Sequence, residues 1–146
     1  MGPLSLAILA VVAACAAIAL RFGRAPERCG GTIVFVWVAA DAVYHLLFGP
    51  SGFDAVDPVE AVFDGSELVA VVWLALRANR TWPLWAAAAQ LLCVSGHVVA
   101  LIDHGGMRRA YWAMTQLPQY IQLTAILVGT AGHARRRGPE RSWRAA

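Results

Sequence analysis

Apolar residues follow one another in five long stretches, and short polar segments separate these stretches. A helix needs about 20 apolar residues to cross the hydrocarbon core of a bilayer, and four of the stretches meet this requirement. The middle stretch is less apolar because its first half contains Glu60, Asp64 and Glu67. The pattern predicts an all-α fold, an integral membrane bundle of five transmembrane helices at residues 3–22, 31–49, 59–77, 82–103 and 110–133.

The distribution of arginine supports counting the middle stretch as a span. Arginine residues near helix ends are retained on the cytoplasmic side of a membrane. With five spans, the N-terminus lies outside and the C-terminus in the cytoplasm, and only Arg108 and Arg109 fall on the outer side. With four spans, the C-terminal arginines would lie on the other side from those of the first loop. In the five-span arrangement, the cytoplasmic arginines are Arg21, Arg24, Arg28, Arg77, Arg80, Arg135, Arg136, Arg137, Arg141 and Arg144.

The composition agrees with a membrane protein and restricts its partners. Hydrophobic residues make up 59% of the 146 residues and charged residues only 14%, whereas about a quarter of the residues in a soluble domain are charged. The surplus of apolar side chains must face lipid, so we expect a single bundle over 1–134 in a bacterial inner membrane, with an arginine-rich cytoplasmic tail over 135–146. We expect no nucleic-acid partner, because the arginines flank apolar stretches instead of forming a separate basic domain.

Polar residues inside the predicted spans concentrate in the outer half of the bundle. An ionisable side chain in hydrocarbon costs at least ~2.5 kcal/mol, so each one needs a partner, a water-filled cavity or a shallow position. Residues three, four or seven apart share a helix face, and the polar positions follow such spacings on four of the helices. We therefore predict a polar pocket that opens to the outer face. Its candidate ligand-binding residues are Asp41, His45, Glu67, Gln90, His97 and Gln119.

Three of these residues are candidates for proton chemistry. Asp41 precedes His45 by four residues, and a carboxylate at that spacing can fix the tautomer of an imidazole and make it a proton donor or relay. Glu67 would be the complementary base. Two histidines and a carboxylate would also suffice for a divalent metal ion, but the sequence has no HxxxH or HExxH spacing, so we assign no metal ligands, and the cofactor stays unknown.

Several polar residues, including two of the candidates, also have a structural interpretation. Gln90, Gln119 and Gln122 fit interhelical hydrogen bonds that hold the bundle together. Asp64 is expected at the membrane interface, and His104 and His133 are expected to be solvated at helix ends. The three cysteines lie far apart without CxxC spacing, so we expect free thiols. They are Cys15, Cys29 and Cys93.

Two resemblances arise at these residues. The stretch Arg80-Thr81-Trp82-Pro83-Leu84-Trp85-Ala86-Ala87, followed by His97 and Tyr120, resembles a recurring pattern in small polytopic bacterial inner-membrane proteins of uncharacterised activity. That resemblance implies a location and no activity.

The second resemblance is to the EXPERA, or emopamil-binding-like, membrane fold of sterol isomerases and related ligand-binding proteins. Asp41 with His45, Glu67 with Trp73, and Gln90-Leu91 with Gly96 are similar to its cavity-lining motifs, over residues 37 to 130. The resemblance implies a cavity for a cationic or sterol-like ligand. The order of the acid and histidine is reversed here, and the asparagine expected on the last helix is missing unless Gln119 or Gln122 substitutes for it.

Three functions remain open from the sequence. The first is a non-enzymatic accessory or small-ligand-binding module, whose partner is a lipid-like small molecule or another membrane protein. The second is a membrane enzyme of the proton-transfer isomerase type, with Asp41 and His45 as acid and Glu67 as base. The third is a haem- or metal-binding electron-transfer subunit, which would use His45 and His97.

Overall fold

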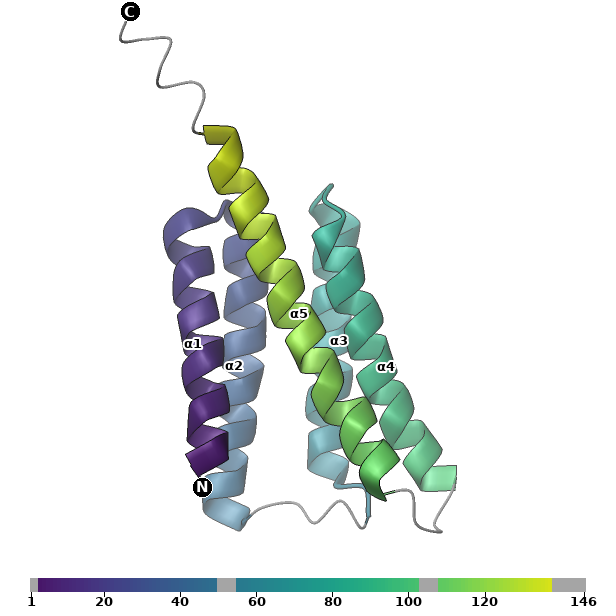
Figure 1. Ribbon diagram of the computed structural model, residues 1–146. Coiled ribbons are helices and arrows are strands. Elements are labelled where there is room, and N and C mark those ends of the chain that lie inside the picture. Colours follow the sequence, from purple (N-terminus) through teal and green to yellow (C-terminus); the bar gives the residue numbers. More distant parts are fainter. Residues whose placement is uncertain (1–2, 50–54, 103–107, 138–146) are drawn as a thin grey trace, which may run out of the picture.

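The chain folds into helices only. The computed structural model describes residues 3–49, 55–102 and 108–137. This part of the chain forms five helices and no strand (Figure 1), so the predicted all-α class is confirmed. The helices are α1 (Pro3–Phe22), α2 (Ala25–Phe48), α3 (Pro58–Arg77), α4 (Trp82–Ile102) and α5 (Arg108–Arg137).

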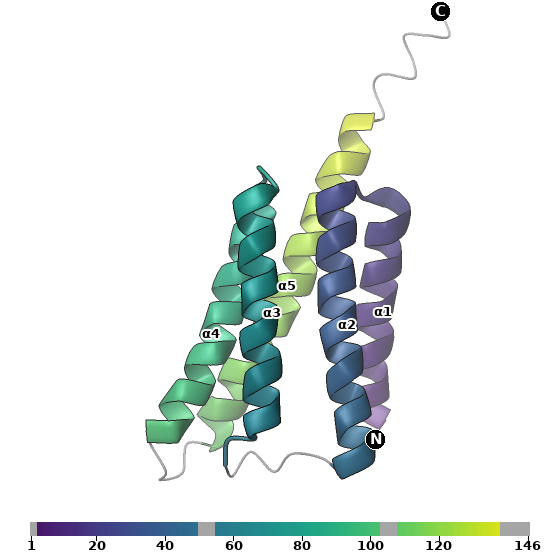
Figure 2. The same cartoon turned by 180° about the vertical axis from the view of Figure 1, so that it is seen from behind.

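The helices lie side by side and alternate in direction. Each helix packs against the next one along the chain, and α5 also contacts α1 and α2. Figures 1 and 2 show α5 running at a slope past the pair α1 and α2 on one side and the pair α3 and α4 on the other. The bundle is therefore closed by its last helix.

The alternation in direction separates arginine from the acidic residues. At one end of the bundle, α1, α3 and α5 finish while α2 and α4 begin (top of Figure 1). We call this the arginine end, because it carries Arg21, Arg24, Arg28, Arg77, Arg80 and Arg135. The opposite end, which we call the acidic end, receives the C-terminal part of α2 and the first turns of α3. Asp41, Asp57, Glu60 and Asp64 lie toward the acidic end.

Two helices differ from the predicted bounds by more than one residue. Helix α2 begins at Ala25 and not at residue 31, because a proline occupies its first turn and the Glu27 carboxylate accepts a hydrogen bond from the backbone N–H of Arg24 at 2.9 Å. Helix α5 extends beyond the predicted 110–133 at both ends, since arginine is a good helix former even outside an apolar stretch. His133 is buried, so its predicted solvation is wrong.

The arginine end is stabilised by a hydrogen bond between Glu27 and Trp82. Both side chains are buried, and the indole Nε1–H donates to Glu27 Oε1 at 3.1 Å. Gly30 and Gly129 lie against the indole, where an added Cβ would come within 2.5 Å of ring atoms. The ring therefore joins α2, α4 and α5 inside the bundle.

Large apolar side chains cover the outside of the bundle. By length and composition, α2 and α4 could each cross a membrane, and Leu6–Phe22 is a shorter apolar helix. Charged and amide side chains interrupt α3 and α5. Several outward-facing side chains are at least 68% exposed, which is unusual on a protein surrounded by water. They are Leu47, Phe48, Val62, Val69, Leu76, Trp85 and Ile102.

Candidate functional site

The polar residues near the acidic end form two clusters that meet on α3. We call the first the His45 cluster, which consists of Asp41, His45 and Glu60. We call the second the His97 cluster, which consists of Asp64, Cys93 and His97. Glu60 and Asp64 are four residues apart, so the clusters share one face of α3 and lie about 6 Å apart along its axis.

In the His45 cluster, two carboxylates meet one ring nitrogen. His45 Nε2 lies 2.9 Å from Glu60 Oε1 and 3.4 Å from Asp41 Oδ1. Asp41 comes from the same helix, one turn earlier, and Glu60 from the first turn of α3. The cluster therefore ties the end of α2 to the beginning of α3.

The other ring nitrogen of His45, Nδ1, shows which nitrogen of the ring carries a proton. Nδ1 lies 3.0 Å from the backbone carbonyl oxygen of Gly49. A carbonyl oxygen only accepts hydrogen bonds, so Nδ1 must carry a proton. A neutral ring would then direct the bare lone pair of Nε2 at two carboxylates. The short distances are therefore satisfied by a second proton on the ring, by a proton on one of the carboxyl groups, or by a metal ion between Nε2 and the oxygens.

Helix α3 is held in place beside this cluster by Asp57. One oxygen of Asp57 accepts from the backbone N–H of Val59 at 2.8 Å and caps the helix. The other accepts from the Tyr44 hydroxyl at 2.9 Å. Asp57 is therefore a structural acid near the cluster, with its own donors.

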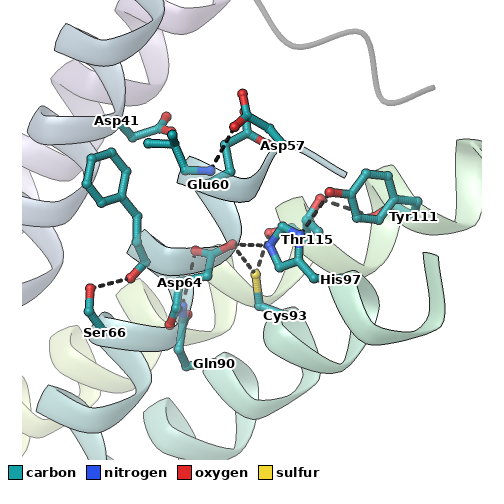
Figure 3. Close-up of polar contacts among 12 residues, drawn as sticks. Asp41, Asp57, Glu60, Asp64, Ser66, Gln90, Cys93, His97, Tyr111 and Thr115 are labelled. Carbon is teal, nitrogen blue, oxygen red and sulfur yellow. Dashed lines mark hydrogen bonds and ion pairs between the residues drawn. The ribbon is translucent and has the colours of Figure 1, made fainter. Parts of the chain in front are cut away.

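The His97 cluster is built around the carboxylate of Asp64. Oδ2 lies 2.6 Å from His97 Nε2 and 3.2 Å from Cys93 Sγ. The other ring nitrogen of His97, Nδ1, lies 2.9 Å from the Tyr111 hydroxyl. Figure 3 shows these side chains converging from α3, α4 and α5, and Cys93 and His97 are almost completely buried.

Amide side chains continue this network toward the middle of the bundle. Gln90 Nε2 donates to Asp64 Oδ1 at 3.2 Å, and Gln122 Nε2 donates to Gln90 Oε1 at 2.8 Å. Gln122 is also the hydrogen-bond partner of Glu67. The second carboxylate oxygen of Glu67 is buried and has no hydrogen-bond partner among the described residues.

The structure divides the predicted site residues between these networks. Asp41 and His45 form the predicted pair, and Gln90 and His97 both contact Asp64. Glu67 belongs to the Gln122 network and makes no hydrogen bond or ion pair with the His45 cluster in the described residues.

Gln119 is half-buried on α5 and takes no part in the hydrogen bonds of the described residues. His45 and His97 belong to different clusters, so they do not face each other across one cofactor site. His104 lies outside the described residues.

Three residues of the clusters, and Tyr111 beside them, were absent from the predicted site. Asp64 was expected at the interface and instead accepts hydrogen bonds within the bundle. Glu60 lies on the same face of α3 as Asp64, so the four-residue spacing of these two acids could have identified both as site residues. Cys93 lies four residues before His97 on the same face of α4, but a cysteine within an apolar stretch resembles a packing residue. Nothing in the sequence singles out Tyr111.

Both clusters contain residue types that bind metal ions. In each cluster the three ligand atoms lie within 4.8 Å of one another. The His45 cluster offers one nitrogen and two oxygens, and the His97 cluster offers nitrogen, oxygen and sulfur. The three cysteines of the chain are free thiols, so Cys93 is available as a ligand.

Comparisons of the chain with protein-family models, with curated proteins and with solved structures find no match.

Proposed function

We propose that the chain is a five-span inner-membrane protein that binds a small cation in its outer half and acts as a non-enzymatic accessory module. The arginine end would face the cytoplasm, since arginine is retained there. The N-terminus would then lie outside. Apolar side chains that cover the bundle support contact with lipid on all sides.

The least apolar helix, α3, is compatible with this topology. Three of its carboxylates interrupt the span, and an unpaired charge in hydrocarbon would be costly. Glu60 instead meets His45, Asp64 meets His97, and Glu67 meets Gln122. Since these partners come from other helices, the acids face the bundle and leave apolar residues such as Val62 and Val69 on the outside.

Thiol labelling in intact cells tests the topology at two exposed positions that flank α3. Ala55→Cys lies before this helix and Thr81→Cys lies after it. We expect a membrane-impermeant reagent to label residue 55 in intact cells, and residue 81 only after the cells are permeabilised. The labelled residue is identified by mass spectrometry, which separates it from the natural cysteines. Labelling of both positions from the outside would contradict the five-span arrangement.

The observation that carries the proposed cation binding is the environment of His45. Its Nδ1 faces a carbonyl oxygen at 3.0 Å, and its Nε2 faces carboxylate oxygens at 2.9 and 3.4 Å. Histidine nitrogen with carboxylate oxygens is a ligand set that zinc accepts. The side chain of Asp41 is 44% exposed, so an ion can arrive from the acidic end.

The accessory role is favoured over the two alternatives by the grouping of the side chains. An isomerase would need an acid and a base on one substrate. The candidate acid pair, Asp41 and His45, and the candidate base, Glu67, lie in different networks. A haem would need two facing histidines, and the rings of His45 and His97 each have their own partners. Zinc titration of the purified, metal-free protein tests the proposed binding, and Glu60→Gln is expected to weaken it.

A further inference from the structure

We propose that Asp64, Cys93 and His97 form a second metal site that takes a zinc-class transition-metal ion. This site goes beyond the proposed function, because it uses different residues from the His45 cluster. Its ligand atoms are Asp64 Oδ2 from α3, and Cys93 Sγ and His97 Nε2 from α4, and all three lie within 4.8 Å of one another. Oxygen, sulfur and nitrogen are the three kinds of atom that bind zinc in proteins.

The three atoms are close to the separation that a bound ion needs. Oδ2 lies 2.6 Å from Nε2 and 3.2 Å from Sγ. With metal–ligand bonds of about 2.0–2.3 Å in tetrahedral geometry, ligand atoms lie roughly 3.3–3.6 Å apart. Side-chain movements of under about 1 Å would therefore admit the ion.

Hydrogen bonds orient Asp64 for this role. Gln90 Nε2 donates to Oδ1 at 3.2 Å and to the Asp64 backbone carbonyl at 3.1 Å, so Oδ2 is directed at the thiol and the imidazole. Gln122 in turn donates to Gln90 Oε1 and fixes which end of that amide faces the acid. Outer partners of this kind hold the ligands of natural metal sites in position.

Tyr111 allows His97 to bind an ion without becoming charged. When Nε2 carries the proton and donates it to Asp64, Nδ1 accepts from the Tyr111 O–H. A hydroxyl can also accept, so the ring can carry its proton on Nδ1 and donate it to the Tyr111 oxygen. This tautomer frees the lone pair of Nε2 for the metal. His45 holds this tautomer already, because its Nδ1 donates to a carbonyl oxygen.

The protons balance in this exchange. The imidazole stays neutral, since it loses the proton on Nε2 and gains one on Nδ1. Tyr111 keeps its proton and rotates it away from the ring. The Cys93 thiol loses its proton to solvent and binds as a thiolate, so binding of the divalent ion releases a single proton.

The ligand set and burial indicate the kind of ion. A thiolate favours zinc and cobalt over magnesium and calcium, which prefer oxygen ligands. Cys93 and His97 are each 3% exposed, so the ion would be held in a dry environment. Three protein ligands leave a fourth position for water or for another ligand, which is the pattern of open zinc sites.

Cobalt titration of the purified, full-length protein in lipid nanodiscs tests this site. We expect a near-ultraviolet absorption band from thiolate bound to Co²⁺, which disappears when Zn²⁺ displaces the cobalt. Cys93→Ser should abolish the band, and His97→Gln should weaken zinc binding at the site at least ~100-fold. Tyr111→Phe should keep the band and weaken binding about 10–100-fold, because the outer partner of His97 is lost.

The controls separate this site from the His45 cluster and from loss of the fold. Cys15→Ser and Cys29→Ser should retain the band, and Glu60→Gln should also retain it even though it weakens the His45 cluster. Circular dichroism shows whether each variant is helical. Absence of the band in the wild-type protein would overturn the proposal without any variant, and so would a band that persists in helical Cys93→Ser.

Discussion

Replacing Glu27 by alanine is expected to lower the free energy of unfolding by about 2–4 kcal/mol. The substitution removes the acceptor of the buried Trp82 indole N–H and the acceptor of the Arg24 backbone N–H. The indole cannot turn toward another acceptor, because Gly30 and Gly129 lie against its ring. The buried donor therefore stays unsatisfied, and the start of α2 loses its cap.

The size of this effect is measured by reversible unfolding in detergent, with a double-mutant cycle as the control. In a Trp82→Phe background the indole donor is already absent, so Glu27→Ala should cost at least ~1 kcal/mol less than in the wild type. Gly65→Ala is a reference in α3 that should not destabilise the protein, because a Cβ there meets no atom within 4 Å and alanine is the better helix former. If Glu27→Ala lowers the free energy of unfolding equally in both backgrounds, the hydrogen bond between Glu27 and Trp82 does not stabilise the arginine end.

Zinc binding at the His45 cluster is expected to weaken at least ~100-fold in Glu60→Gln, because loss of an outer partner alone typically costs about 10–100-fold. The glutamine keeps the size of the side chain but removes a charged ligand that lies 2.9 Å from Nε2. Isothermal titration of metal-free protein measures the affinity. The Cys93→Ser background removes the thiolate ligand of the second site from the measurement.

Asp57→Asn is the matched control for this substitution. It removes the same charge from the same region, and its amide oxygen can still cap α3. Since Asp57 is bound to Tyr44 and is not part of the cluster, zinc affinity should change by less than about threefold. Equal loss in both variants would mean that zinc responds to the general charge of the acidic end and not to a defined ligand set.

The sequence predicted the helices well because each one depends on its own residues. Length, apolar character and the helix start at Pro58 are local properties, and the predicted start of α3 is within one residue of the observed one. The start of α2 was missed although its signals, a proline in the first turn and the Glu27 cap, are local. Gly30 and Gly31 resemble loop residues, but Gly30 belongs to the helix and makes room for Trp82.

The site was harder to predict because it depends on which helices meet. Spacing correctly placed Asp41 beside His45, since both residues are on α2. It could not show that Glu60 would meet His45 or that Asp64 would meet His97, because these contacts join different helices. The similar depth of the polar residues in the predicted spans suggested one shared pocket. The orientation of α3 between its neighbours instead produces two clusters.

The state of the His45 ring tests the proposed cation site most directly. Nitrogen-15 NMR of histidine side chains, with the signal of this residue assigned by His45→Gln, distinguishes a bare ring nitrogen from a protonated or metal-bound one. In metal-free protein we expect a proton on Nδ1 of His45, and after zinc is added we expect Nε2 to become metal-bound. A bare Nε2 in the metal-free protein that does not respond to zinc would contradict the proposal.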